Sequence, residues 1–121
     1  MSALLQQITS LNVKLFSTRL HRDVVLTILL PAGYKKGTQY QLLLVNDGQD
    51  LAAMHMADIL WQNQNLLIPF VTVGIHANEN RIQEYGTAHQ PDYANRGTLA
   101  GQTEAFVLHE LIPFLAATYN C

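Results

Sequence analysis

The sequence predicts an α/β fold, in which a β-hairpin precedes parallel strands that alternate with helices. Two apolar runs, at residues 40–46 and 68–75, are bounded by turn residues, as is typical of strands buried on both faces of a parallel sheet. Apolar residues at helical spacing follow each run, at 51–64 and at 101–118. Because buried strands and helices alternate, we expect a parallel sheet with right-handed crossovers.

Length and composition favour a single compact domain. The chain has 121 residues, of which 49% are hydrophobic and 13% charged, the opposite of the balance in a disordered chain. A net charge of −2 gives no electrostatic reason to bind nucleic acid or an anionic membrane. No apolar run reaches the roughly 18 residues of a membrane span, and no signal peptide is evident. We therefore expect a cytoplasmic protein with neither a nucleic acid nor a membrane as partner.

The hairpin is expected at the beginning of the chain. Residues 8–19 alternate between apolar and polar, with one lapse, and residues 24–30 are rich in Val, Ile and Leu. The short polar break at 20–23 favours antiparallel pairing of the two strands. Residues 31–37 contain one proline and two glycines and are predicted to form a loop.

The two predicted helices carry distinct signals. In 51–64, an apolar stripe includes Leu51, Met54 and Trp61, and either Asp47 or Asp50 is expected to cap the first turn. In 101–118, Pro113 should kink the helix or end its first part. The long polar stretch at 77–100 is predicted to be an irregular loop of functional or disordered character.

The turn at residues 47–50 (DGQD) is the first candidate for chemistry. It lies where a strand ends and a helix is expected, so its backbone N–H groups could stabilise a developing negative charge. The alternative is a tight turn with a capping aspartate. Asp47 and Asp50 are poor candidates for a metal site, because no further ligands occur at a recognisable spacing.

The second candidate region is the polar stretch after residue 77. Arg81 and Glu84 are three residues apart and would pair on a helical turn, which favours an ion pair that holds the loop over a role in binding substrate. Tyr93 and Arg96 suit a pocket wall as well as a solvated surface. His76 follows a predicted strand, a common place for catalytic groups, but an ordinary structural role is the stronger expectation.

The nucleophile inventory is the most decisive feature of the sequence. Serines occur only at Ser2, Ser10 and Ser17, and none stands in a G-x-S-x-G elbow. Cys121 is the single thiol and the last residue. We therefore expect no catalytic serine or cysteine within this chain.

Six ordered motifs resemble the esterase D and enterochelin-esterase branch of the α/β-hydrolases. They are residues 24–34 (VVLTILLPAGY), 42–49 (LLLVNDGQ), 70–75 (FVTVGI), 81–85 (Arg-x-x-Glu-Tyr), 96–97 (Arg-Gly) and 110–114 (ELIPF). The resemblance implies the N-terminal half of an α/β-hydrolase sheet, with residues 1–121 as one incomplete domain. In that family the nucleophile-elbow strand follows the helix of the last motif, so the whole catalytic triad is expected beyond Cys121.

The resemblance also implies roles for particular residues. The parent would cleave a small carboxylic ester through an acyl-serine intermediate, without cofactor or metal. The backbone N–H of Gln49 would be one oxyanion-hole donor, with Gly48 allowing close approach of the substrate. Arg81, Glu84, Tyr85 and Asp47 would shape the site.

The family's strand order predicts how the chain associates. If the strands lie in the order first, second, fourth, third, the strand 40–46, with Tyr40 and Asn46 at its ends, becomes an apolar edge that can template another chain. We therefore expect a homo-oligomer, and an alternative function is an inactive domain that acts through self-association. A flavodoxin-like binding module is a third possibility, against which the absence of G-x-G-x-x-G counts.

Overall fold

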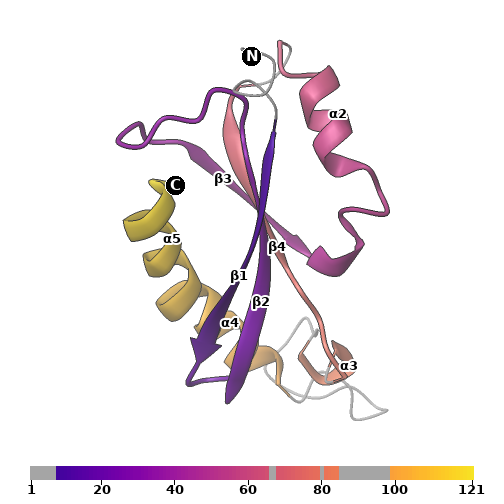
Figure 1. Ribbon diagram of the computed structural model, residues 1–121. Coiled ribbons are helices and arrows are strands. Elements are labelled where there is room, and N and C mark those ends of the chain that lie inside the picture. The colour runs from indigo at the N-terminus through magenta and orange to yellow at the C-terminus, as the bar shows by residue number, and fades with distance from the viewer. Residues whose placement is uncertain (1–7, 66–67, 80, 85–98) are drawn as a thin grey trace.

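A computed structural model describes residues 8–65, 68–79, 81–84 and 99–121 of the chain (Figure 1). Its centre is a mixed sheet of four strands: β1 (Thr9–Ser17), β2 (Arg22–Leu30), β3 (Gln41–Asn46) and β4 (Phe70–Ile75). The strands lie in the order β1-β2-β4-β3. The hairpin of β1 and β2 is antiparallel, β2 is antiparallel to β4, and β3 is parallel to β4. The predicted hairpin, the parallel pair and the strand order are confirmed.

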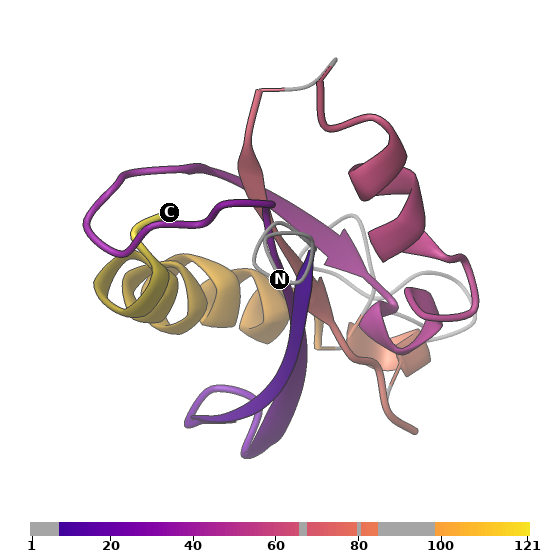
Figure 2. The ribbon, with the colours of Figure 1, turned by 45° about the horizontal axis from the view of Figure 1, so that its top comes forward.

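The helical segments are short and lie on both sides of the sheet. On one side, α4 (Ala100–Phe106), the π-helical turn η2 (Val107–Leu111) and α5 (Ile112–Tyr119) form one nearly continuous helix; α2 (Met56–Gln62) lies on the other side (Figures 1 and 2). A 3₁₀ turn, η1 (Gly48–Asp50), follows β3, and α3 (Arg81–Glu84) is a single helical turn. None of the described helices is long and apolar enough to cross a bilayer.

The predicted break at Pro113 takes the form of a π-helical turn. Pro113 stands in the first turn of α5, where a missing N–H costs little. The wider turn of η2 immediately precedes it, so the helix continues in place of ending at Ile112. Proline and π turn together preserve the helix direction.

The hydrophobic core lies between the sheet and the helix on the α5 side. It consists of nine buried side chains, three from each of β2, β4 and the long helix: Val24, Leu26, Ile28, Val71, Val73, Ile75, Phe106, Leu111 and Leu115. Alternate residues of β2 supply its share, as the period of two in a strand requires. This layer fixes the sheet, whose carboxyl edge carries the candidate site.

Two predictions about burial are wrong. The helix expected over 51–64 begins only at Met56, and none of its residues is buried; of the predicted stripe, Leu51 alone is buried, ahead of the helix. The strand at 40–46 is not buried on both faces, since its burial alternates and Leu43 is 40% exposed. Both errors have one cause: these segments have apolar sequences, but the described chain covers only one side of them.

Candidate functional site

The candidate site lies where β3 and β4 end, at the turn that begins with Asp47. Asp47 adopts the left-handed conformation, with φ 57°, and the chain then enters η1. Its carboxylate forms no capping bond to the turn, so the expected N-cap role of Asp47 is wrong; the carboxylate binds Arg81 instead. Asp50 lies inside η1 and therefore does not cap it.

Gly48 is held against Gly74, one residue before the end of β4. A Cβ on Gly48 would overlap the carbonyl group of Gly74, and a Cβ on Gly74 would lie 2.7 Å from the Cα of Gly48. Both positions therefore require glycine, because the two backbones touch. This contact fixes the height of the 47–50 turn above the sheet.

The side chain of Gln49 ties the turn to the segment after β4. Its Oε1 accepts a hydrogen bond of 2.9 Å from the backbone N–H of Ala77, and its Nε2 donates one of 3.2 Å to Asp47 Oδ1. The backbone N–H of Gln49 has no acceptor in the described part of the chain. It belongs to the first turn of η1, where N–H groups lack acceptors within the helix. One donor is thus presented by a turn that is braced on both sides.

Arg81 braces the other side of Asp47. Its Nε and Nη2 donate to the two carboxylate oxygens of Asp47, both at 2.8 Å. This bidentate pair holds the pKa of Asp47 below its usual value, with the hydrogen bond from Gln49 adding to the effect. Asp47 is therefore an anion at neutral pH, and it joins β3 to α3.

Arg81 and Glu84 do form a helical turn, but in the described structure each is paired with a different residue, Arg81 with Asp47 and Glu84 with Arg22. Glu84, which is 3% exposed, accepts bonds from Arg22 of β2, from Nε at 3.0 Å and from Nη2 at 2.7 Å. The segment is held by ion pairs, as expected, but one runs to the turn after β3 and the other to β2. Arg22 was not singled out by the sequence, because only the fold brings it to α3.

Several predicted positions lie outside the described residues: Ser2, Tyr85, Tyr93 and the Arg96-Gly97 pair.

A further polar anchor, Glu110 of η2, was not predicted. Its carboxylate accepts bonds from the hydroxyl of Ser17 at 2.7 Å and from the hydroxyl and backbone N–H of Thr18 at 2.8 and 2.9 Å. Burial raises the pKa of Glu110, but these bonds and one from the backbone of Arg19 outweigh it and hold the pKa below the usual value. The sequence feature that could have indicated this anchor is the acidic residue that begins the ELIPF motif, three residues before its proline.

Next to the turn, a cavity of about 350 Å³ lies between the sheet and η1. It is lined by Ser10, Asn12, Thr27, Leu29, Gly48, Gln49, Leu51, Ala52, Ala57 and His76. His76 Nε2 lies 2.6 Å from the hydroxyl of Thr27, which itself donates to Asn12 at 2.8 Å. Burial lowers the pKa of His76, so its imidazole is neutral at pH 7. No group of three metal-ligating side chains occurs among the described residues.

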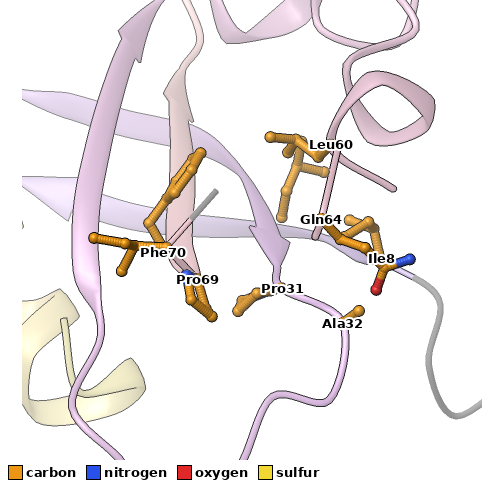
Figure 3. Close-up of a pocket in the computed structure, with 9 residues that line it drawn as sticks. Ile8, Pro31, Ala32, Leu60, Gln64, Pro69 and Phe70 are labelled. Atoms are coloured by element: carbon orange, nitrogen blue, oxygen red, sulfur yellow. The ribbon is translucent and has the colours of Figure 1, made fainter. Parts of the chain in front are cut away.

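A second, smaller cavity of about 80 Å³ lies at the opposite end of the sheet (Figure 3). Its walls are mainly apolar and include Pro31, Leu60, Pro69 and Phe70, with Gln64 as a polar member. The carboxyl-end cavity, in contrast, contains the Gln49 turn and a histidine. Of these two cavities, the one at the carboxyl end therefore carries the titratable side chain, His76.

Comparison with known proteins agrees with this geometry. Residues 17–121 match the model of the family described as "Putative esterase". Among curated proteins, none matches the chain. An IroE-like serine hydrolase from Shewanella oneidensis superimposes with a TM-score of 0.75 at 27% identity, covering 93% of this chain and 39% of its own.

Two more distant structures share the fold. The enterobactin esterase of Shigella flexneri has a TM-score of 0.70 at 20% identity, with 93% of this chain and 27% of its own covered. A ferulic acid esterase of Anaeromyces mucronatus, in complex with ferulic acid, has a TM-score of 0.71 at 13% identity, with 93% and 44% covered. The chain therefore spans less than half the length of each of these structures. Since the family model extends over most of the sequence, the chain belongs to this esterase family, a hydrolase family with the α/β-hydrolase fold.

Proposed function

We propose that this chain is the oxyanion-binding part of a serine carboxylic-ester hydrolase, with the backbone N–H of Gln49 as one of the two oxyanion donors. The observation that carries the proposal is this N–H group, which has no acceptor in the described chain although the turn around it is fixed. Ester cleavage by a serine enzyme passes through a tetrahedral oxyanion, and donors held in place before the reaction stabilise it most.

The bracing of the turn fits that role. The Gly48–Gly74 contact sets its position, and Gln49 is fixed to Ala77 on one side and to Asp47 on the other. Arg81 holds Asp47 in turn. We assign Asp47 and Arg81 as positioning residues that keep the Gln49 N–H in place, while Glu84 holds α3 itself against β2.

The nucleophile is proposed to lie outside this chain, within the larger part of a longer protein. The hydroxyl of Ser17 is buried and donates to Glu110, so its proton does not point at a histidine. Burial raises the pKa of the Cys121 thiol, the opposite of what activates a cysteine. These contacts support the proposal that neither Ser17 nor Cys121 is the nucleophile.

The first experiment treats the purified chain with a fluorophosphonate probe and measures its intact mass. We expect the 13.5 kDa species to remain unmodified, while a complete esterase treated in parallel gains one adduct. An adduct on this chain would overturn the inactivity and the placement of the nucleophile.

A second experiment tests the Gln49 donor in a chimaera with the part of the Shewanella hydrolase that this chain does not cover. Gln49→Pro removes the backbone N–H, and Gln49→Ala keeps it while removing the same side chain. We expect the proline variant to lose about 10²–10³-fold in kcat relative to the alanine variant, as removal of one oxyanion donor does. Equal activities would contradict the assignment.

A further inference from the structure

We infer that Arg22 of β2 is a further positioning residue, which holds the 47–50 turn in place through α3; this rests on the proposed function, which assigns the Gln49 N–H of that turn as a donor. Arg22 is the first residue of β2, and β2 runs antiparallel to β4, so it lies at the end of the sheet where β4 finishes. In the described part of the chain its guanidinium binds Glu84 and the carbonyl of Asp23, and it does not bind the turn itself. Its influence on the turn must therefore pass through α3.

The helix α3 depends on contacts with other segments for its position. It is a single turn of four residues, Arg81–Glu84. One isolated turn is not stable, because fixing its backbone costs more than its own hydrogen bonds return. Each of its two ends carries a charged side chain that forms a bidentate ion pair, Arg81 with Asp47 and Glu84 with Arg22. These two pairs make α3 a bridge between β2 and the 47–50 turn.

The two ion pairs of the bridge differ in burial. The side chains of Arg81 and Asp47 are 53% and 24% exposed, whereas those of Arg22 and Glu84 are 15% and 3% exposed. An ion pair in contact with water fixes little by itself, because water competes for both charges. A buried pair cannot exchange its partner for water without a large loss. The Arg22–Glu84 pair is therefore the fixed end of α3, and Arg81 passes this position on to Asp47.

The segment 76–84, of which residue 80 lies outside the described residues, is bound to β2 at both ends. At its beginning the backbone N–H of His76 donates to a carbonyl of β2 at 2.9 Å, and at its end Glu84 binds the same strand. Between these points the segment contacts the turn twice, through the backbone of Ala77 and the side chain of Arg81. Loss of the Glu84 anchor should therefore loosen one of the two contacts and leave the other, so we expect a partial effect on the turn.

A pair of substitutions separates positioning from stability. Arg22→Met alone leaves a buried carboxylate without its cation, which destabilises the whole fold. The double variant Arg22→Met/Glu84→Met removes both charges and replaces them with apolar side chains, so the fold should recover while the fixed end of α3 is lost. The double variant therefore tests the position of the turn in a folded chain.

NMR relaxation of the full chain measures the order of the Gln49 N–H without any need for activity. We expect an order parameter of about 0.85 in the original chain, the value of rigid backbone, and a decrease towards about 0.6 in the double variant. The matched control is Glu110→Gln, which weakens the carboxylate anchor between η2 and the β1–β2 turn and should leave the Gln49 signal unchanged. A rigid Gln49 N–H in the double variant, or equal loosening in the control, would overturn the inference.

Kinetics of the chimaera with the Shewanella hydrolase tests whether the loosened turn matters through the N–H group. In a Gln49→Ala background, which keeps this N–H, the double variant should lower kcat about tenfold with KM unchanged, since a displaced donor costs less than a lost one. In a Gln49→Pro background, which lacks the N–H, the double variant should have no further effect.

The possible failures are distinguishable. An unchanged kcat in the alanine background, or equal losses in both backgrounds, would overturn the role of Arg22, because the ion pair would then not act through the Gln49 N–H. Equal activities of the Gln49→Ala and Gln49→Pro chimaeras would instead refute the donor assignment in the proposed function. The NMR order parameter would in that case still decide whether Arg22 holds the turn.

Discussion

The end of the sheet where β3 and β4 finish differs from the end where they begin in what holds its segments together. At the carboxyl end, three carboxylates join distant elements: Asp47 binds Arg81, Glu84 binds Arg22, and Glu110 binds the β1–β2 turn. At the other end the described contacts are uncharged. Pro31, Pro69 and Phe70 line a small apolar cavity (Figure 3), Ile68 is 70% exposed, and the hydrogen bonds, such as that from the Tyr40 N–H to the Asn120 carbonyl, join neutral groups.

The two ends therefore differ in how strictly their contacts fix the positions of the segments. Hydrogen-bonded ion pairs have directions, and the loss of Arg22 would leave the carboxylate of Glu84, which is 3% exposed, without its cation. Apolar contacts have no direction and tolerate small rearrangements. Substitutions at the carboxyl end should therefore cost far more than matched ones at the opposite end, and three predictions measure how much.

The largest effect is expected for Arg22→Met, which leaves the buried carboxylate of Glu84 without its cation. We expect the free energy of unfolding to fall by about 3–5 kcal/mol, measured by urea denaturation at pH 7. The double variant Arg22→Met/Glu84→Met removes both charges and should recover most of that loss. A single variant as stable as the original chain would show that water reaches Glu84.

This pair also marks what the sequence could and could not predict. The strands and the hairpin followed from local apolar periodicity, and the order β1-β2-β4-β3 followed from the family resemblance that the six ordered motifs carry. The partners of Arg81 and Glu84 did not, because i,i+3 spacing favours a local pair and only the fold sets Asp47 and Arg22 beside them. Burial of α2 and β3 was overestimated for a related reason. An apolar face is buried only if another element packs on it, and the sequence of the segment itself does not show which element does so.

The next effect concerns the backbone contact under the candidate site. Gly48→Ala places a Cβ against the carbonyl of Gly74, with backbone on both sides and no flexible side chain to move away. We expect a loss of about 2–3 kcal/mol in the free energy of unfolding, typical of overpacking. Thermal and urea denaturation measure it.

Gly33→Ala is the matched control at the opposite end of the sheet. Nothing lies within 4 Å of a Cβ at Gly33, whose φ of +73° is the one source of strain. The control should therefore cost only about 1 kcal/mol. Gly48 has no positive φ, so a cost at Gly48 no larger than that of the control would show that the Gly48–Gly74 contact relaxes around the added Cβ.

The smallest of the three effects on the free energy of unfolding is expected at Glu110. Its dependence on pH distinguishes it from the effects of Arg22 and Gly48. Because the folded-state pKa of this carboxyl lies below the ordinary value of 4.5, the folded chain gains stability from it above pH 4.5 and loses that gain as the pH falls through the lower folded-state pKa. Glu110→Gln removes this titration and leaves the Ser17 hydroxyl without its acceptor, at a cost of about 1–2 kcal/mol at pH 7.

The difference in unfolding free energy between the two chains should therefore be largest at neutral pH and shrink below pH 4.5. Asp47 titrates in both chains and cancels in the comparison. Ile68→Ser, at the apolar end, should lower stability by a constant amount at every pH, since no titrating group is removed. A Glu110→Gln difference that is equally constant would mean that the carboxylate charge contributes nothing to holding η2 against the β1–β2 turn, and that the contrast between the two ends rests on Arg22 and Gly48 alone.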